Sequence, residues 1–118
     1  MMATIKSYSD LQQSKVLATI LPIESADMCW QYQKDRWVGE PDYKEFPQFE
    51  HAIDKRDIPC WSLAALLSVL PVIEYSKPII ALDDNYITYP LSDLNTKADN
   101  PVDACVAMIE KLHELKML

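Results

Sequence analysis

Three cysteines and two histidines are the side chains of this 118-residue chain best suited to nucleophilic or metal chemistry. Cys60 lies near the start of the uncharged run 58–71, which we predict to be helical. A thiol near a helix N-terminus has a lowered pKa, which favours the nucleophilic thiolate. A cysteine nucleophile also needs a base. The histidines are His51, in an irregular stretch, and His113, on the polar side of the last predicted helix. We therefore interpret Cys60 as a buried packing thiol, with a cysteine nucleophile as the alternative.

The second candidate site is a zinc site, for which Cys29, Cys60, Cys105 and His113 are the possible ligands. Structural zinc sites use closely paired ligands such as Cys-x-x-Cys, and none of these residues has that spacing. An odd number of widely spaced cysteines is also unlike a disulfide framework, so we expect reduced, mostly buried thiols. The sequence therefore predicts no metal and no cofactor.

Adjacent carboxylates at Asp83 and Asp84 are suited to acid chemistry or to binding a hard cation, but the oxygen-rich loop of a calcium site is missing. A solvated hairpin turn is the simpler interpretation. Gly39 is the only glycine, which excludes a glycine-rich phosphate loop and a Gly-x-Ser-x-Gly motif. We predict no catalytic residue, and a small hydrolase that depends on cysteine or carboxylates is an alternative function.

Six of the eleven aromatic residues fall between Trp30 and Phe49, mixed with charged residues and interrupted by two prolines. Aromatic residues and arginine are enriched at protein interfaces. The stretch is too polar to be core along its whole length, so some rings should reach the surface, where a partner would bury them. Packing of the rings on the sheet is the alternative. The predicted protein-interaction residues are Trp37, Tyr43 and Phe46.

The helices that would position these residues follow from apolar periodicity and proline stops. A helix over 58–70 would be apolar on almost every side, which is typical of a buried central helix. A second helix is predicted over 10–21 with Ser9 as its N-cap, and a third over 101–117 with Asn100 as its N-cap and Pro101 opening it. The expected buried stripe of the third helix is Val102, Cys105, Val106, Ile109, Leu112 and Leu115.

Strands are predicted where residue types alternate or β-rich runs flank a turn. Alternation at 28–32 indicates one strand, a turn at 33–35 leads to a second at 36–38, and runs 79–82 and 86–89 form a hairpin. Residues 39–57 are expected to be a long irregular excursion with a short helix near 49–53, and 92–100 a polar loop. The predicted fold class is α+β: three main helices packed on a small, mostly antiparallel sheet with hairpins, in a single domain spanning 1–118.

The net charge of −7 argues against a nucleic-acid partner, because phosphate binding needs a basic patch. The scattered acids leave an acidic DNA-mimic inhibitor as a further alternative. No run is long and apolar enough for a membrane span, and no signal peptide is evident, so we expect a cytoplasmic protein.

Three segments resemble small uncharacterised proteins of phages, prophages and mobile elements of gut Bacteroidetes. They are residues 17–28, 58–67 (IPCWSLAALL) and 100–109 (NPVDACVAMI). The resemblance covers the predicted helices, about half of the chain, and transfers no catalytic residue. It implies an accessory role, which we interpret as that of a non-enzymatic protein-binding module. The expected partner is another protein or a second copy in a homodimer.

Overall fold

The computed structural model describes residues 6–33, 39, 42–50, 55–73, 76–81, 86–90 and 93–118. These residues form three α-helices, a 3-10 helix and two small antiparallel sheets, so the predicted α+β class is confirmed. In chain order the elements are α1 (Leu11–Leu17), η1 (Ile23–Ser25), β1 (Met28–Trp30), β2 (Ile58–Cys60), α2 (Leu63–Val69), β3 (Ile79–Ala81), β4 (Tyr86–Thr88), β5 (Asn95–Lys97) and α3 (Pro101–Glu114).

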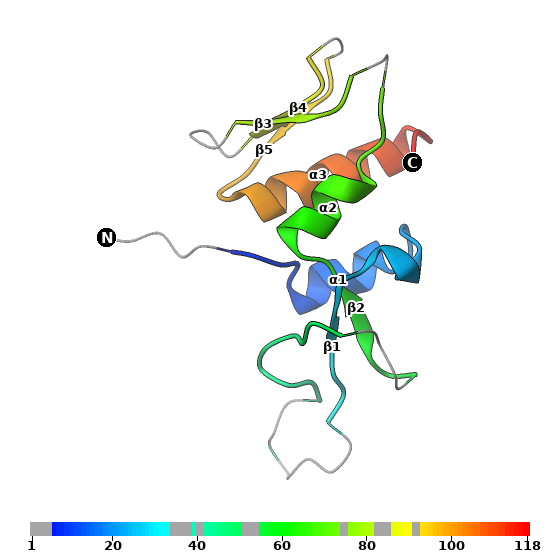
Figure 1. Ribbon diagram of the computed structural model, residues 1–118, viewed down its shortest axis with the longest axis vertical. Coiled ribbons are helices and arrows are strands. Elements are labelled where there is room, and N and C mark those ends of the chain that lie inside the picture. The colour runs from blue at the N-terminus through cyan, green and yellow to red at the C-terminus, as the bar shows by residue number, and fades with distance from the viewer. Residues whose placement is uncertain are drawn as a thin grey trace, which may run out of the picture.

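The helices lie between the two sheets (Figure 1). The sheet of β3, β4 and β5, in that order, lies at one end and packs on α3, which in turn packs on α2. The sheet of β1 and β2 lies at the other end and packs on α1 through β2. The main apolar core fills the space among the helices and the three-stranded sheet. Its largest fully buried side chains are Trp61, Tyr89, Leu17, Leu66, Ile87, Met108, Ile109 and Leu112.

The last helix begins as the sequence predicts. Asn100 accepts a hydrogen bond from the backbone N–H of Asp103 at 2.9 Å, and Pro101 occupies the first turn, where its missing N–H has no cost. The expected stripe is buried except for Leu115, which is 52% exposed. The prediction for Leu115 is wrong because α3 ends at Glu114 and the chain then turns through Lys116, whose φ is 58°.

The predicted central helix over 58–70 is wrong at its N-terminal end. Residues 58–60 form β2, in which Cys60 pairs with Met28 and Pro59 with Cys29. The helix begins only after Ser62, whose hydroxyl accepts the backbone N–H of Ala65 at 3.2 Å. Pairing with β1 gives these residues backbone partners outside their own segment, and local apolar periodicity cannot reveal such partners. The α2 helix is also exposed on one side: Ala65 and Leu66 are buried, whereas Ala64 and Ser68 are exposed.

The first helix is shorter than predicted and has a different cap. Asp10, not Ser9, caps α1, and it forms a capping box with Gln13 through hydrogen bonds of 2.8 and 3.0 Å. Ser9 is fully buried, where its hydroxyl accepts the backbone N–H of Trp61 at 3.1 Å. The helix ends at Leu17, and residues 18–20 continue as turns instead of reaching residue 21.

The hairpin of β3 and β4 is confirmed, with Ile80 opposite Ile87, although its turn at 82–85 lies outside the described residues. The polar stretch 92–100 contains β5, which the sequence did not indicate. This edge strand carries Thr96 toward α3, where its hydroxyl donates to the backbone oxygen of Ala104 at 2.7 Å. Asn95 and Lys97 on either side of Thr96 are polar and exposed, so the sequence of this edge strand resembles that of a polar loop.

Strand β1 is shorter than the predicted alternation and is buried throughout, because it lies between β2 on one side and residues 42–48 on the other. The predicted strand at 36–38 and most of the turn before it lie outside the described residues. Of the short helix expected at 49–53, residues 49 and 50 are bends and the remainder lies outside the described residues.

Candidate binding surface

Residues 42–50, which we call the bulged segment, are held against β1 by their backbone. The backbones of Cys29 and Gln48 exchange two hydrogen bonds of 2.9 and 2.8 Å. The backbone N–H of Lys44 donates to the backbone oxygen of Gln31 at 3.0 Å. Tyr43 and Gln48 are five positions apart, whereas their bridge partners Tyr32 and Cys29 are three apart. Two extra residues must therefore leave the pairing between Tyr43 and Gln48, as in the special β-bulges that contain more than one extra residue.

One aromatic ring lies within the bulge and a second lies just beyond it, and both are exposed. Phe46 lies between the two pinned positions and is 60% exposed, and Phe49, just beyond the second, is 79% exposed. Pro47 between them is buried and cannot donate a backbone hydrogen bond to β1. The predicted residue Phe46 is therefore at the surface, and Phe49 is a second exposed ring that the sequence analysis did not select.

Tyr43, the second predicted interaction residue, is half-buried and packed. Its ring meets that of Tyr32 edge-to-face with centroids 5.8 Å apart, and its hydroxyl donates to the backbone oxygen of Arg56 at 2.9 Å. The Arg56 guanidinium in turn lies 4.0 Å from the centroid of the Tyr32 ring. Burial raises the pKa of Tyr43, so its hydroxyl stays a neutral donor. The third predicted residue, Trp37, lies outside the described residues.

A pocket of about 410 Å³ opens between α1 and the bulged segment. Leu11 and Lys15 of α1, Trp30 of β1 and residues 42–45 line it. Trp30 is almost completely buried and its indole N–H donates to Ser14 at 3.1 Å, so the ring is fixed in place. The Lys15 ammonium lies 5.9 Å from the centroid of the Tyr43 ring. The pocket therefore has one fixed aromatic wall at Trp30, and charged residues of both signs are part of its lining.

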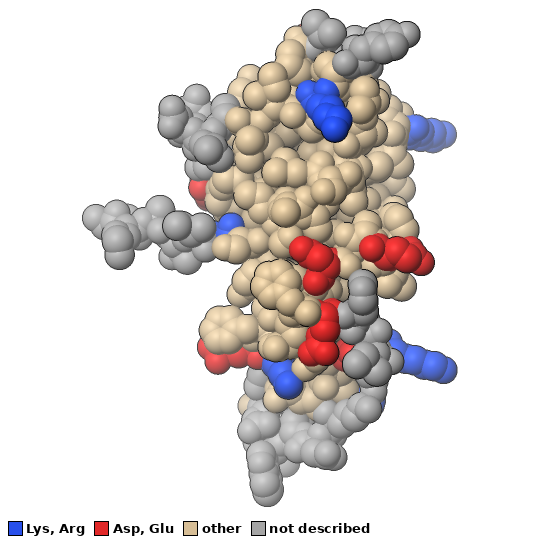
Figure 2. All heavy atoms as spheres, in the orientation of Figure 1, with Lys and Arg blue, Asp and Glu red and all other residues tan. Residues whose placement is uncertain are grey.

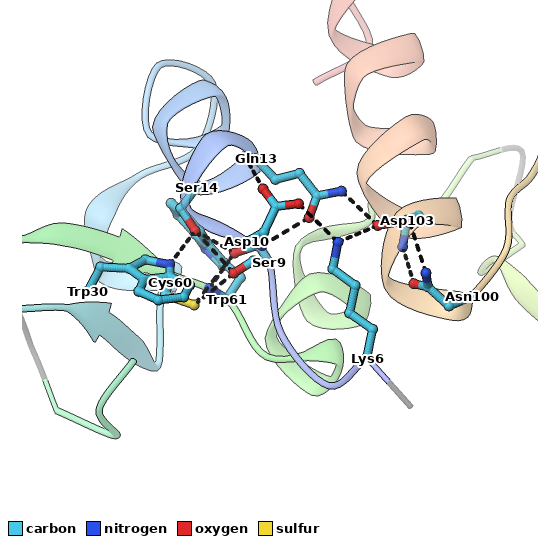
Figure 3. A network of polar contacts seen from close by, with 10 residues as sticks. All are labelled: Lys6, Ser9, Asp10, Gln13, Ser14, Trp30, Cys60, Trp61, Asn100 and Asp103. Atoms are coloured by element: carbon cyan, nitrogen blue, oxygen red, sulfur yellow. Dashed lines mark hydrogen bonds and ion pairs between the residues drawn. The ribbon is translucent and has the colours of Figure 1, made fainter. Parts of the chain in front are cut away.

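Cys60 lies in β2, not at a helix N-terminus, within a polar network that joins α1, β1 and β2 (Figure 3). Its thiol donates to the backbone oxygen of Ser9 at 3.3 Å, and the hydroxyls of Ser9 and Ser14 are 2.8 Å apart. Burial is the main reason that the pKa of Cys60 is raised, which opposes formation of the thiolate. These contacts are those of a structural thiol.

The residues considered for zinc are not assembled by the fold. Within the described ranges, no group of three or more histidine, cysteine or acidic side chains is arranged to hold a metal ion. Cys105 is buried in α3, whereas His113 is exposed and its Nδ1 lies 3.3 Å from the backbone oxygen of Leu118. The three cysteines are free and buried, as predicted. His51, Asp83 and Asp84 lie outside the described residues.

Charged side chains gather around the middle and the β1–β2 end of the face shown in Figure 2. Both signs occur there, and the carboxylates of the described residues on this face form no regular row. An acidic DNA mimic would present rows of carboxylates at phosphate-like spacing.

Comparison with known proteins finds no matching family model, no matching curated protein and no matching solved structure. Among the described residues, no helix has the length and apolar character to cross a membrane. The resemblance to phage and mobile-element proteins stays a prediction.

Proposed function

We propose that this protein is a non-enzymatic protein-binding module, and that it binds through the bulged segment and the adjoining pocket. The observation that carries the proposal is the pair of exposed rings, Phe46 and Phe49, on a segment whose backbone is pinned to β1 at Gln48. Exposed rings beside a preformed pocket are typical of interaction hot spots, because their burial removes a large apolar area from water at little ordering cost.

The resemblance described above supports an accessory role in a phage or mobile element, and a binding module suits such a role. A net charge of −7 supports a protein rather than a nucleic acid as the partner. The partner is therefore expected to present apolar or aromatic anchors, with charged groups of both signs around them to meet the mixed charges of Lys15, Asp42, Lys44 and Glu45.

The test is selection of a displayed random-peptide library on the immobilised protein. Two variants accompany it: the double variant Phe46→Ser/Phe49→Ser, and Ile79→Ser as the matched control. Ile79 is 54% exposed and lies on β3, in the other sheet. Selected peptides should carry apolar anchors and bind the wild type and Ile79→Ser equally, and they should bind the double variant about 30-fold more weakly.

Equal binding of the selected peptides to all three proteins would contradict the proposed surface. A thermal melt of each variant accompanies the selection. At a protein concentration low enough for single chains, the double variant should melt within a few degrees of the wild type, because both rings are mainly exposed.

A further inference from the structure

We infer that a second copy of this chain is a partner of this surface, with Phe46 of each copy seated in the pocket of the other. The inference rests on the proposed function and names its partner. The ring and the pocket belong to the same molecule, since Phe46 directly follows Glu45, which lines the pocket.

The pocket has room for the ring. A cavity of about 150 Å³ holds a benzene molecule, and the pocket has about 410 Å³. Leu11 and Trp30 offer apolar and aromatic contacts, and aromatic pairs favour edge-to-face or offset arrangements that a ring entering beside Trp30 can adopt. A ring that is 60% exposed in the single chain would lose part of its contact with water there.

Charge favours this face for contact between two copies. Each copy carries −7, so most approaches of two copies bring like charges together. The two lysines and two carboxylates that line the pocket, Lys15, Lys44, Asp42 and Glu45, sum to zero, so the lining itself adds no like-charge repulsion to the contact. In a two-fold arrangement, lysines of one copy are also able to face carboxylates of the other.

The position of the ring determines the kind of assembly. When a protruding group and its pocket are far apart on a molecule, copies join head to tail and form open chains. Here residue 46 adjoins the pocket-lining residues 42–45, so a two-fold axis beside them brings both rings into both pockets at once. The expected assembly is therefore a closed homodimer.

The experiment is sedimentation velocity of the full chain over a range of concentrations, with four single variants. Phe46→Ser removes the ring, and Lys15→Trp fills the pocket from an exposed position on α1. Lys15→Ala removes the charge without filling the pocket and so separates the two effects of Lys15→Trp. Ile79→Ser is the control for an exposed apolar residue elsewhere. The wild type and Ile79→Ser should dimerise equally. Lys15→Ala should dimerise only about three-fold more weakly, because it loses one charge of the pocket lining, whereas Phe46→Ser and Lys15→Trp should each dimerise about 30-fold or more weakly.

Mixing the two defective variants is the decisive measurement. Phe46→Ser keeps an intact pocket and Lys15→Trp keeps its ring, so a mixed dimer has one working contact and each homodimer has none. The mixture should therefore associate more strongly than either variant alone. A monomeric wild type, an unaffected Phe46→Ser variant or a mixture that gains nothing would each overturn the inference.

The two proposals fail differently. If the wild type is monomeric but selected peptides bind in a manner that depends on Phe46 and Phe49, a second copy is not the partner and the binding function stands. If peptides do not depend on these rings either, the proposed function fails as well.

Discussion

The Lys6 ammonium lies 2.7 Å from a carboxylate oxygen of Asp103, across 97 positions of the chain. The same oxygen accepts a hydrogen bond from the Gln13 side chain at 2.7 Å, and the other accepts one from the Asn100 amide at 2.8 Å. Figure 3 shows these groups converging on the first turn of α3. Asp103 therefore connects α1 and the segment before it to the N-terminal end of α3, where a negative charge is favourable.

This connection predicts a loss of stability in acid. Burial alone would raise the pKa of Asp103, but hydrogen bonds from Lys6, Gln13 and Asn100 together lower it below its usual value of 3.8. A carboxyl group with a lowered folded-state pKa stabilises the fold above its unfolded pKa, and that contribution is lost as the pH falls through the folded value. For Lys6, burial lowers the pKa and its carboxylate partners raise it by more, so its contribution is lost only in strong base.

Asp103→Asn should therefore cost roughly 1 kcal/mol of unfolding free energy at neutral pH, since the ion pair is partly exposed. The difference from the wild type should shrink as the pH falls below about 4, where Asp103 of the unfolded chain becomes protonated, and should vanish once the folded carboxylate, whose pKa is lower, is protonated too. Urea titrations of both proteins from neutral to acid pH measure the difference. A difference that grew on acidification would mean that Asp103 is not stabilised as its anion.

Leu66→Ala should cost about 2–5 kcal/mol of unfolding free energy, because the Leu66 side chain on α2 is fully buried in the main core and its truncation leaves a cavity. Ala64→Ser is the matched control, since residue 64 lies on the exposed side of the same helix and should change stability by about 0.5 kcal/mol or less. Denaturant unfolding of both variants tests this expectation. A loss below about 1 kcal/mol for Leu66→Ala would show that α2 does not lie in the core.

The three thiols should react slowly with thiol reagents in the native protein and rapidly after unfolding. Burial raises the pKa of Cys29 to about 11 and that of Cys105 to about 12, and it also raises the pKa of Cys60, so little thiolate is present at neutral pH. Mass spectrometry of labelled protein with and without denaturant measures each site. Rapid, selective labelling of native Cys60 would instead restore the case for a nucleophile.

Tyr43 and Phe46 should respond differently to substitution, although the sequence placed them in one group. Tyr43→Ser removes the contact with Tyr32 and the hydrogen bond to Arg56, so it should lower the unfolding free energy by about 1–3 kcal/mol. Phe46→Ser should change it by about 0.5 kcal/mol or less at a protein concentration low enough for single chains, because the ring is then mostly in solvent. Parallel denaturant titrations compare the two, and equal losses would show that Phe46 is also packed.

Local signals in the sequence were sufficient for α3 and for the hairpin of β3 and β4. The start of α3 depends on Asn100 and Pro101, which act within one helical turn, and the hairpin depends on two β-rich runs that are close in sequence. The burial of the three cysteines also followed from their apolar neighbours. Each of these features depends on contacts between residues that are near one another in the chain or on side-chain type alone.

Tertiary structure decided the features that depend on distant pairing. The apolar periodicity of residues 58–60 predicts a helix, but β1 supplies their backbone partners. Ser9 does not cap α1, because its hydroxyl accepts a hydrogen bond from the buried backbone N–H of Trp61. The candidate binding surface has the same origin. The aromatic composition of 30–49 pointed to the region, whereas the exposure of Phe46 depends on the two extra residues between Tyr43 and Gln48 in the pairing with β1. A register between strands is set by hydrogen bonds and burial across the whole fold, so local sequence cannot specify which ring remains in solvent.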